Sequence, residues 1–174
     1  HVHPCQVGGL ARSGWVALGY HGDPERTAAT FPVIDGVRWS LPGDQARLEP
    51  DGTITVLGRG STCINTGGEK VFPEEVENVL KSHPAVFDAL VVGVPDPHYG
   101  QRIVAVWSAR PEADAAGGPA RPGDGDLETH VRQHLAGYKV PRAWVAVDQC
   151  RRFPTGKPDY AWARAEAEAA ASST

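Results

Sequence analysis

The sequence predicts an α+β fold in two parts: a β-rich segment over residues 1–58, and then a small three-stranded mixed sheet covered by helices over residues 59–174. In the first part, short apolar runs are separated by Gly, Pro and Asp, which favour turns. In the second part, helical and strand-like patterns alternate in the order helix, strand, strand, helix, strand, helix. This order is typical of a sheet with helices packed against it.

The elements of the first part follow from capping and turn residues. Asp23-Pro24-Glu25 predicts a short helix through Ala29, because Asp23 is a favourable N-cap and proline suits the first helical position. The segment Asp35–Leu57 predicts a hairpin about Asp51-Gly52, because both positions tolerate positive φ. The second strand of this hairpin stops at Gly58.

The first elements of the second part follow from periodicity. Pro73–His83 is predicted to be an amphipathic helix, since Val76, Val79 and Leu80 fall on one face and carboxylates follow the proline in the first turn. Strands are expected over Ala89–Val94, ended by Pro95, and over Ile103–Ala109.

The remaining elements lie beyond a Gly/Pro/Ala-rich loop at residues 110–125. A helix is expected from an Asp126 cap to Leu135, followed by a strand over Ala143–Val147. The Ala/Glu-rich tail Asp159–Ala171 has high helix propensity and predicts a last helix.

Charge and apolar patterning exclude two classes of function. With 17 Lys and Arg against 21 Asp and Glu, the net charge is −4, and no basic run suggests nucleic-acid binding. The longest apolar run is much shorter than the roughly 20 residues of a membrane-spanning helix.

Cysteine and histidine positions argue against disulfides and metal. Cys5, Cys63 and Cys150 are far apart, which predicts free thiols in a reducing, cytoplasmic compartment. His130 and His134 share a helix face without a third ligand nearby, so no metal site is predicted. The sequence has no methionine and begins at His1, so we expect a piece of a longer polypeptide.

Three short motifs carry candidate chemistry. An aspartate after a turn glycine, as in Gly43-Asp44, can accept hydrogen bonds from both hydroxyls of a ribose. Gly58-Arg59 is followed by Gly67-Gly68, where backbone without a Cβ can approach a ligand. In Phe153-Pro154-Thr155-Gly156-Lys157, a lysine after a turn can bring its charge to a phosphate or carboxylate. Each motif alone is also found in ordinary turns.

Taken in order, these motifs resemble the carboxyl-terminal region of the adenylate-forming acyl-CoA synthetases. The matching phrases are GYHGDPERTAATF, PGD, GRGSTCINTGGEKVFPEEVENVLKSHPAVFDALVVGVPDPHYGQ, LAGYKVPR and FPTGK. They extend from about residue 8 to about residue 163. INTGGEKVFPEEVE and GKPDY are similar to the actinobacterial fatty-acyl and steroid-side-chain ligases.

The resemblance implies a reaction and a role for each motif. Members of the family convert an acid and ATP to an acyl-adenylate, swing the small domain, and transfer the acyl group to CoA. Asp44 would hold the ribose of the nucleotide, Arg59 the ribose and phosphate region, and Lys157 would be the catalytic lysine of adenylation. Gly67 and Gly68 would line the pantetheine path of CoA, and Lys70 would meet the CoA phosphates.

The resemblance also implies an organisation. Residues 1–58 would be the β-rich closing subdomain of a large lobe and residues 59–174 the mobile domain, with the hinge at Ser61, where relatives usually carry Lys or Asp. The phosphate-loop and adenine motifs of the family are absent. We therefore expect a large N-terminal domain in cis to hold most of the ATP, Mg²⁺ and acid sites, and the 174 residues alone to be inactive. The full-length protein is expected in the cytoplasm, with attachment to a membrane surface as an alternative.

Two other functions fit parts of the pattern. Adenylating domains that pass the acyl group to a carrier protein share these motifs, although Gly-Gly-Glu-Lys favours the CoA users. A non-catalytic interaction module would have no need of Lys157.

Overall fold

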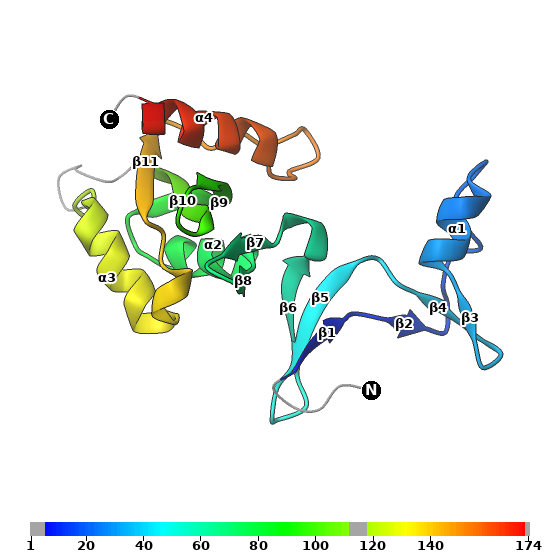
Figure 1. The fold of residues 1–174 in the computed structure, drawn as a ribbon. Helices are drawn as coiled ribbons and strands as arrows, with labels where there is room; N and C mark the ends of the chain where they lie inside the picture. The colour runs from blue at the N-terminus through cyan, green and yellow to red at the C-terminus, as the bar shows by residue number, and fades with distance from the viewer. Residues whose placement is uncertain (1–5, 112–117, 173–174) are drawn as a thin grey trace. The chain divides into compact units, whose positions relative to one another are not determined.

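The computed structural model describes residues 6–111 and 118–172, and it divides into two compact units, His1–Thr62 and Cys63–Thr174 (Figure 1). The predicted boundary of a mobile domain, after residue 58, concerns motion and stays a prediction. Cys5 lies outside the described residues, whereas Cys63 and Cys150 are free thiols. None of the helices in the described part of the chain is long and apolar enough to cross a bilayer.

The first unit contains two small antiparallel sheets. One has the order β1-β5-β6 and the other β2-β4-β3. The predicted hairpin about Asp51-Gly52 is formed by β5 and β6. A second hairpin turns at Asp35-Gly36, where both residues have positive φ. The strands are β1 (Val7–Gly9), β2 (Arg12–Ser13), β3 (Val33–Ile34), β4 (Val37–Ser40), β5 (Asp44–Leu48) and β6 (Ile54–Arg59).

The helix of this unit, α1 (Pro24–Thr30), begins as predicted. The Asp23 carboxylate accepts a hydrogen bond from the Arg26 N–H at 2.9 Å, as an N-cap does. A 3₁₀ turn, η1 (Gly60–Thr62), ends the unit.

The second unit is built on a five-stranded mixed sheet. In its centre β10 (Gly100–Ala109) pairs with the antiparallel β9 (Val86–Asp96) and the parallel β11 (Ala143–Val147). The hairpin of β7 (Ile64–Thr66) and β8 (Glu69–Val71) joins at Gly100. The helices are α2 (Pro73–Lys81), α3 (Asp124–His134) and α4 (Tyr160–Ser172), with a 3₁₀ turn η2 (Gly137–Lys139).

Both faces of this sheet are buried. Alternate residues of β9 and β10 pack on α2 and α3, while the residues between them pack on α4. The first core includes Val91, Trp107, Val76, Leu80 and Leu127. The second includes Leu90, Val92, Val106, Cys150 and Ala163. Burial on both sides explains why the strand sequences read as nearly continuous apolar runs.

The α+β class is confirmed, with three corrections of detail. The sheet has five strands rather than three, because the residues about Gly67-Gly68 pair as a hairpin. Strand β9 continues through Pro95, which is tolerated because β9 pairs only with β10 among the described strands. Asp126 is not the N-cap of α3: Gly123 is, and the Asp126 carboxylate in the first turn accepts the Gly123 N–H at 2.9 Å.

Candidate functional site

Asp44 and Arg59 lie together in the first unit. They are opposite each other on β5 and β6, and Arg59 Nε is 3.6 Å from Asp44 Oδ1. Within the described part of the chain, this ion pair is the only contact of the Asp44 carboxylate with a charged group, and the distance is too long for a hydrogen bond. Since 29% of the Asp44 side chain and 64% of the Arg59 side chain are exposed, both remain accessible. A carboxylate and a guanidinium so arranged can bind the hydroxyls of a ribose and a nearby phosphate.

The turn at Gly67-Gly68 is set by backbone conformation. The two glycines have φ of +59° and +87°, and the Gly67 N–H donates to the Tyr99 carbonyl at 2.9 Å. Among the described residues, a Cβ on Gly68 would meet nothing within 4 Å, and one on Gly67 would make only an ordinary 3.5 Å contact with Tyr99. The glycines therefore leave open space beside exposed backbone. Lys70 follows on β8 and is exposed.

Lys157 lies on a short hairpin before α4. The Phe153 N–H donates to the Lys157 carbonyl at 2.9 Å, and the Gly156 N–H donates to the Phe153 carbonyl at 2.8 Å. Gly156 has a φ of +79°. The Lys157 side chain is exposed, and no ion-pair partner for its amine is found among residues 6–111 and 118–172. The amine is therefore available to a ligand.

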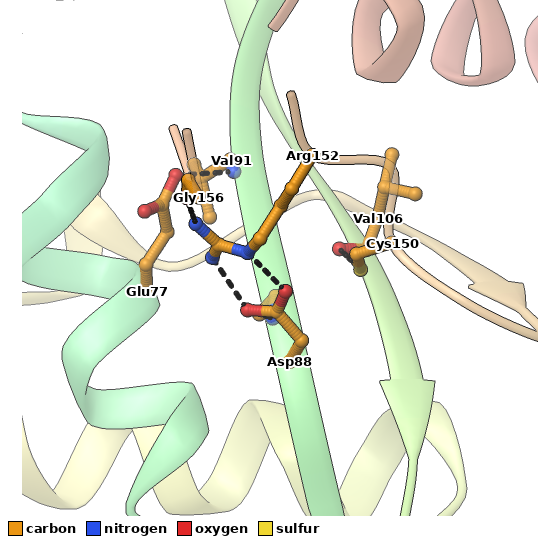
Figure 2. Close-up of polar contacts among 8 residues, drawn as sticks. Glu77, Asp88, Val91, Val106, Cys150, Arg152 and Gly156 are labelled. Carbon is orange, nitrogen blue, oxygen red and sulfur yellow. Dashed lines mark hydrogen bonds and ion pairs between the residues drawn. The ribbon is translucent and has the colours of Figure 1, made fainter. Parts of the chain in front are cut away.

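The lysine hairpin is tied to the sheet by Arg152 (Figure 2). Its Nε and Nη2 donate to the two carboxylate oxygens of Asp88 at 2.7 and 2.8 Å, and its Nη1 donates to the Gly156 carbonyl at 3.0 Å. Hydrogen bonding to Asp88 raises the pKa of Arg152. Asp88 belongs to β9 and is 8% exposed.

The surroundings of this ion pair hold two further titratable groups. Burial raises the pKa of Glu77 to about 7. The hydrogen bond that its Oε1 accepts from the Val91 N–H at 2.9 Å lowers the pKa but does not cancel the effect of burial. Burial also raises the pKa of the Cys150 thiol to about 11. Both groups are therefore mainly protonated below pH 7, and Cys150 is unsuited to act as a nucleophile.

The predicted hinge residue, Ser61, lies in η1 at the end of the first unit. This turn is fastened by the Thr62 hydroxyl, which donates to the Arg59 carbonyl at 2.8 Å. The structure therefore places Ser61 two residues from Arg59 and two from the start of the second unit, and its role in motion stays a prediction.

Two open cavities do not coincide with the predicted residues. One, of about 630 Å³, is lined by Phe87, Asp88, Gln149, Cys150, Arg151, Arg152 and Trp162. The other, of about 610 Å³, lies in the first unit and is mainly apolar. Asp44, Arg59 and Lys157 line neither of these two cavities.

The family is decided by the segment that ends at this lysine. A profile of the AMP-binding enzyme C-terminal domain matches residues 75–157, from the first turn of α2 to Lys157. Residues 75–157 belong to that family.

Two relatives that match most of this chain are CoA ligases. A medium/long-chain-fatty-acid–CoA/3-oxocholest-4-en-26-oate–CoA ligase of Mycobacterium tuberculosis is 55% identical over 93% of this chain, and the chain spans 28% of its length. A 3-oxocholest-4-en-26-oate–CoA ligase of Rhodococcus rhodochrous is 54% identical over 91% of this chain and 27% of its own length.

A solved structure of a CoA synthetase is also similar to this chain. The o-succinylbenzoate CoA synthetase of Bacillus subtilis, in complex with its acyl-adenylate intermediate, matches 90% of this chain and 30% of its own with 30% identity and a TM-score of 0.76. The chain thus spans under a third of the proteins it matches.

Residue-by-residue reasoning did not single out the anchor of the AMP-binding C-terminal domain's lysine hairpin. The one local signal was the position of the two carboxylates: Asp88 directly precedes the apolar run Ala89–Val94, and Glu77 lies one residue after Val76 of the apolar helix face. A charge in a buried strand needs a partner. Arg152 is such a partner, but the chain distance of 64 residues hides the pairing.

Proposed function

We propose that this chain is the C-terminal part of an ATP-dependent acyl-CoA ligase. The larger enzyme would join a carboxylic acid to ATP, release pyrophosphate, and transfer the acyl group from the adenylate to the CoA thiol with release of AMP. The similarity to fatty-acid and 3-oxocholestenoate ligases supports an acid of medium or long chain, or a steroid side-chain acid, as substrate.

The observation that carries the proposal is the exposed amine of Lys157, which stands on an anchored hairpin at the end of an AMP-binding C-terminal domain. In adenylation, negative charge gathers where the attacking carboxylate meets the α-phosphate. An ammonium group brought there would neutralise this charge and orient the two reactants.

The remaining residues take supporting roles. The Asp44 carboxylate would accept the ribose hydroxyls, and Arg59 would hold the carboxylate in place and reach the phosphate region. The backbone of Gly67 and Gly68 would border the path of the CoA pantetheine, with Lys70 at its phosphates. Ser61 would serve as the hinge between the conformation for adenylation and the conformation for acyl transfer to CoA.

Mg²⁺ would accompany ATP in the larger enzyme. The described residues include no group of three His, Cys, Asp or Glu side chains that could hold a metal ion, and none of the roles proposed for this chain depends on Mg²⁺.

The test compares the 174-residue chain with the longer polypeptide that carries it. With ATP, Mg²⁺, CoA and a panel of fatty and steroid acids, the longer protein should form acyl-CoA and AMP, and the shorter chain alone should form neither. If the longer protein transfers the acyl group only to a carrier protein, the acceptor is a carrier protein and not CoA. Turnover by the shorter chain alone would contradict the proposed division of the site.

A further inference from the structure

The contacts about Lys157 fix its backbone on both sides. The Gly156 carbonyl accepts from Arg152 Nη1 at 3.0 Å, and the Lys157 carbonyl accepts from the Phe153 N–H at 2.9 Å. Because peptide units are planar, holding the Gly156 oxygen orients the peptide that enters Lys157, and holding the Lys157 oxygen orients the peptide that leaves it. Together the two bonds set the direction in which the lysine side chain leaves the backbone.

The Arg152 guanidinium is itself held from the sheet. Two of its N–H groups are used by the two oxygens of Asp88, and a third reaches Gly156. The two residues that follow Asp88 on β9 are fully buried, Ala89 in the first core and Leu90 in the second. The Arg152–Asp88 pair is therefore a bridge from a rigid strand to the hairpin, with charge-assisted bonds throughout.

We propose that Asp88 and Arg152 are positioning residues, which hold the Lys157 hairpin in the conformation needed for adenylation. This inference rests on the proposed function of Lys157. Neither residue would touch the nucleotide, and both would act through the Gly156 carbonyl.

The arrangement requires an arginine. A lysine at position 152 could pair with Asp88 as a point charge, but it lacks the planar fork that serves a carboxylate and a carbonyl at the same time. Asn at position 88 would keep the shape of the aspartate and remove its charge, leaving the guanidinium free to turn away from Gly156.

The first experiment separates the two half-reactions in the longer enzyme. Arg152→Lys and Asp88→Asn should each lower acid-dependent ATP–pyrophosphate exchange about 10- to 100-fold, as expected when a catalytic group is displaced by about an ångström. Acyl transfer from preformed acyl-adenylate to CoA should stay within about twofold. The double variant should lose no more than the worse single variant, because the pair acts as one unit.

The matched control is Arg132→Lys on α3. Arg132 also donates two N–H groups to a carboxylate, that of Glu128, but this pair is exposed and is part of α3, far from the hairpin in sequence. It should leave both half-reactions unchanged. Equal loss of the two half-reactions in Arg152→Lys and Asp88→Asn would indicate a general folding defect and overturn the inference, as would full pyrophosphate exchange in both.

A second measurement needs no activity. In the 174-residue chain, amide hydrogen exchange of Gly156, whose N–H is bonded to the Phe153 carbonyl, should be at least about tenfold faster in Asp88→Asn than in the unaltered chain. Unchanged exchange would overturn the positioning role even if the ligase activity is present. Absence of pyrophosphate exchange in the unaltered longer enzyme would instead defeat the proposed function.

Discussion

Asp44 and Arg59 face each other across paired strands at the end of the β5–β6 hairpin, with Arg59 Nε 3.6 Å from Asp44 Oδ1. The partly exposed carboxylate of Asp44 can still accept hydrogen bonds from a ligand, and the guanidinium limits its orientation. The two residues are 15 positions apart in the chain, so the pairing is a product of strand register and not of a local turn.

Asp44→Asn should weaken nucleotide binding in the longer enzyme. An amide offers one acceptor oxygen instead of two, so only one ribose hydroxyl can be accepted well. We expect the KM for ATP to rise about 10-fold, equivalent to the loss of a charge-assisted hydrogen bond of about 1.4 kcal/mol. Steady-state kinetics at varied ATP measures this. Glu49→Gln, at another ion pair of the same sheet, is the control and should leave the KM unchanged.

Gly67→Asn tests the proposed CoA path. The φ of +59° at Gly67 suits asparagine, and Asn-Gly is a favoured dipeptide for such a turn, so the free energy of unfolding should change by less than about 0.5 kcal/mol. The added side chain would occupy the space beside the exposed backbone. Acyl transfer to CoA should fall about tenfold while pyrophosphate exchange persists. Loss of exchange with retained transfer would place the turn at the nucleotide instead.

Glu77 predicts a pH dependence of stability. Its pKa is about 7 in the folded chain against an ordinary value of 4.5, so between these values the folded state holds a proton that the unfolded state releases. Stability from this group is therefore lost as the pH rises from about 4.5 to about 7 and is constant above that, with a total of up to about 3 kcal/mol.

Glu77→Gln should remove most of this loss, because the amide oxygen can still accept the Val91 N–H. Urea unfolding of the 174-residue chain at about pH 5 and about pH 8 measures the difference. The variant should be more stable than the unaltered chain at the higher pH and similar to it at the lower. Glu128→Gln, on the exposed face of α3, should leave the difference between the two pH values unchanged.

Periodicity and capping predicted the helices and the long strands because these signals are local. The spacing of Val76, Val79 and Leu80 fixed the buried face of α2, and Asp23 fixed the start of α1. The hairpin about Gly67-Gly68 was not predicted, because its strands have three residues each and carry polar side chains. Asp124 and Asp126 both suit the beginning of a helix, so the first turn of α3 could not be fixed from sequence.

The candidate site was only partly predictable for a similar reason. Lys157 stands in a recognisable motif, whereas its anchor depends on two residues 64 positions apart in the chain. Nothing local marks Arg152 as different from Arg151 beside it, which is two-thirds exposed and bonds to Asp159. The fold places Asp88 of β9 beside the hairpin, within reach of the Arg152 guanidinium (Figure 2).

The amine of Lys157 is proposed to serve adenylation and not thioester formation. The most direct test is Lys157→Ala in the longer enzyme, with Lys81→Ala in the last turn of α2 as the control. We expect pyrophosphate exchange to fall by at least about 100-fold in Lys157→Ala, while acyl transfer from preformed acyl-adenylate to CoA continues at close to the normal rate. Undiminished pyrophosphate exchange in Lys157→Ala would contradict this role.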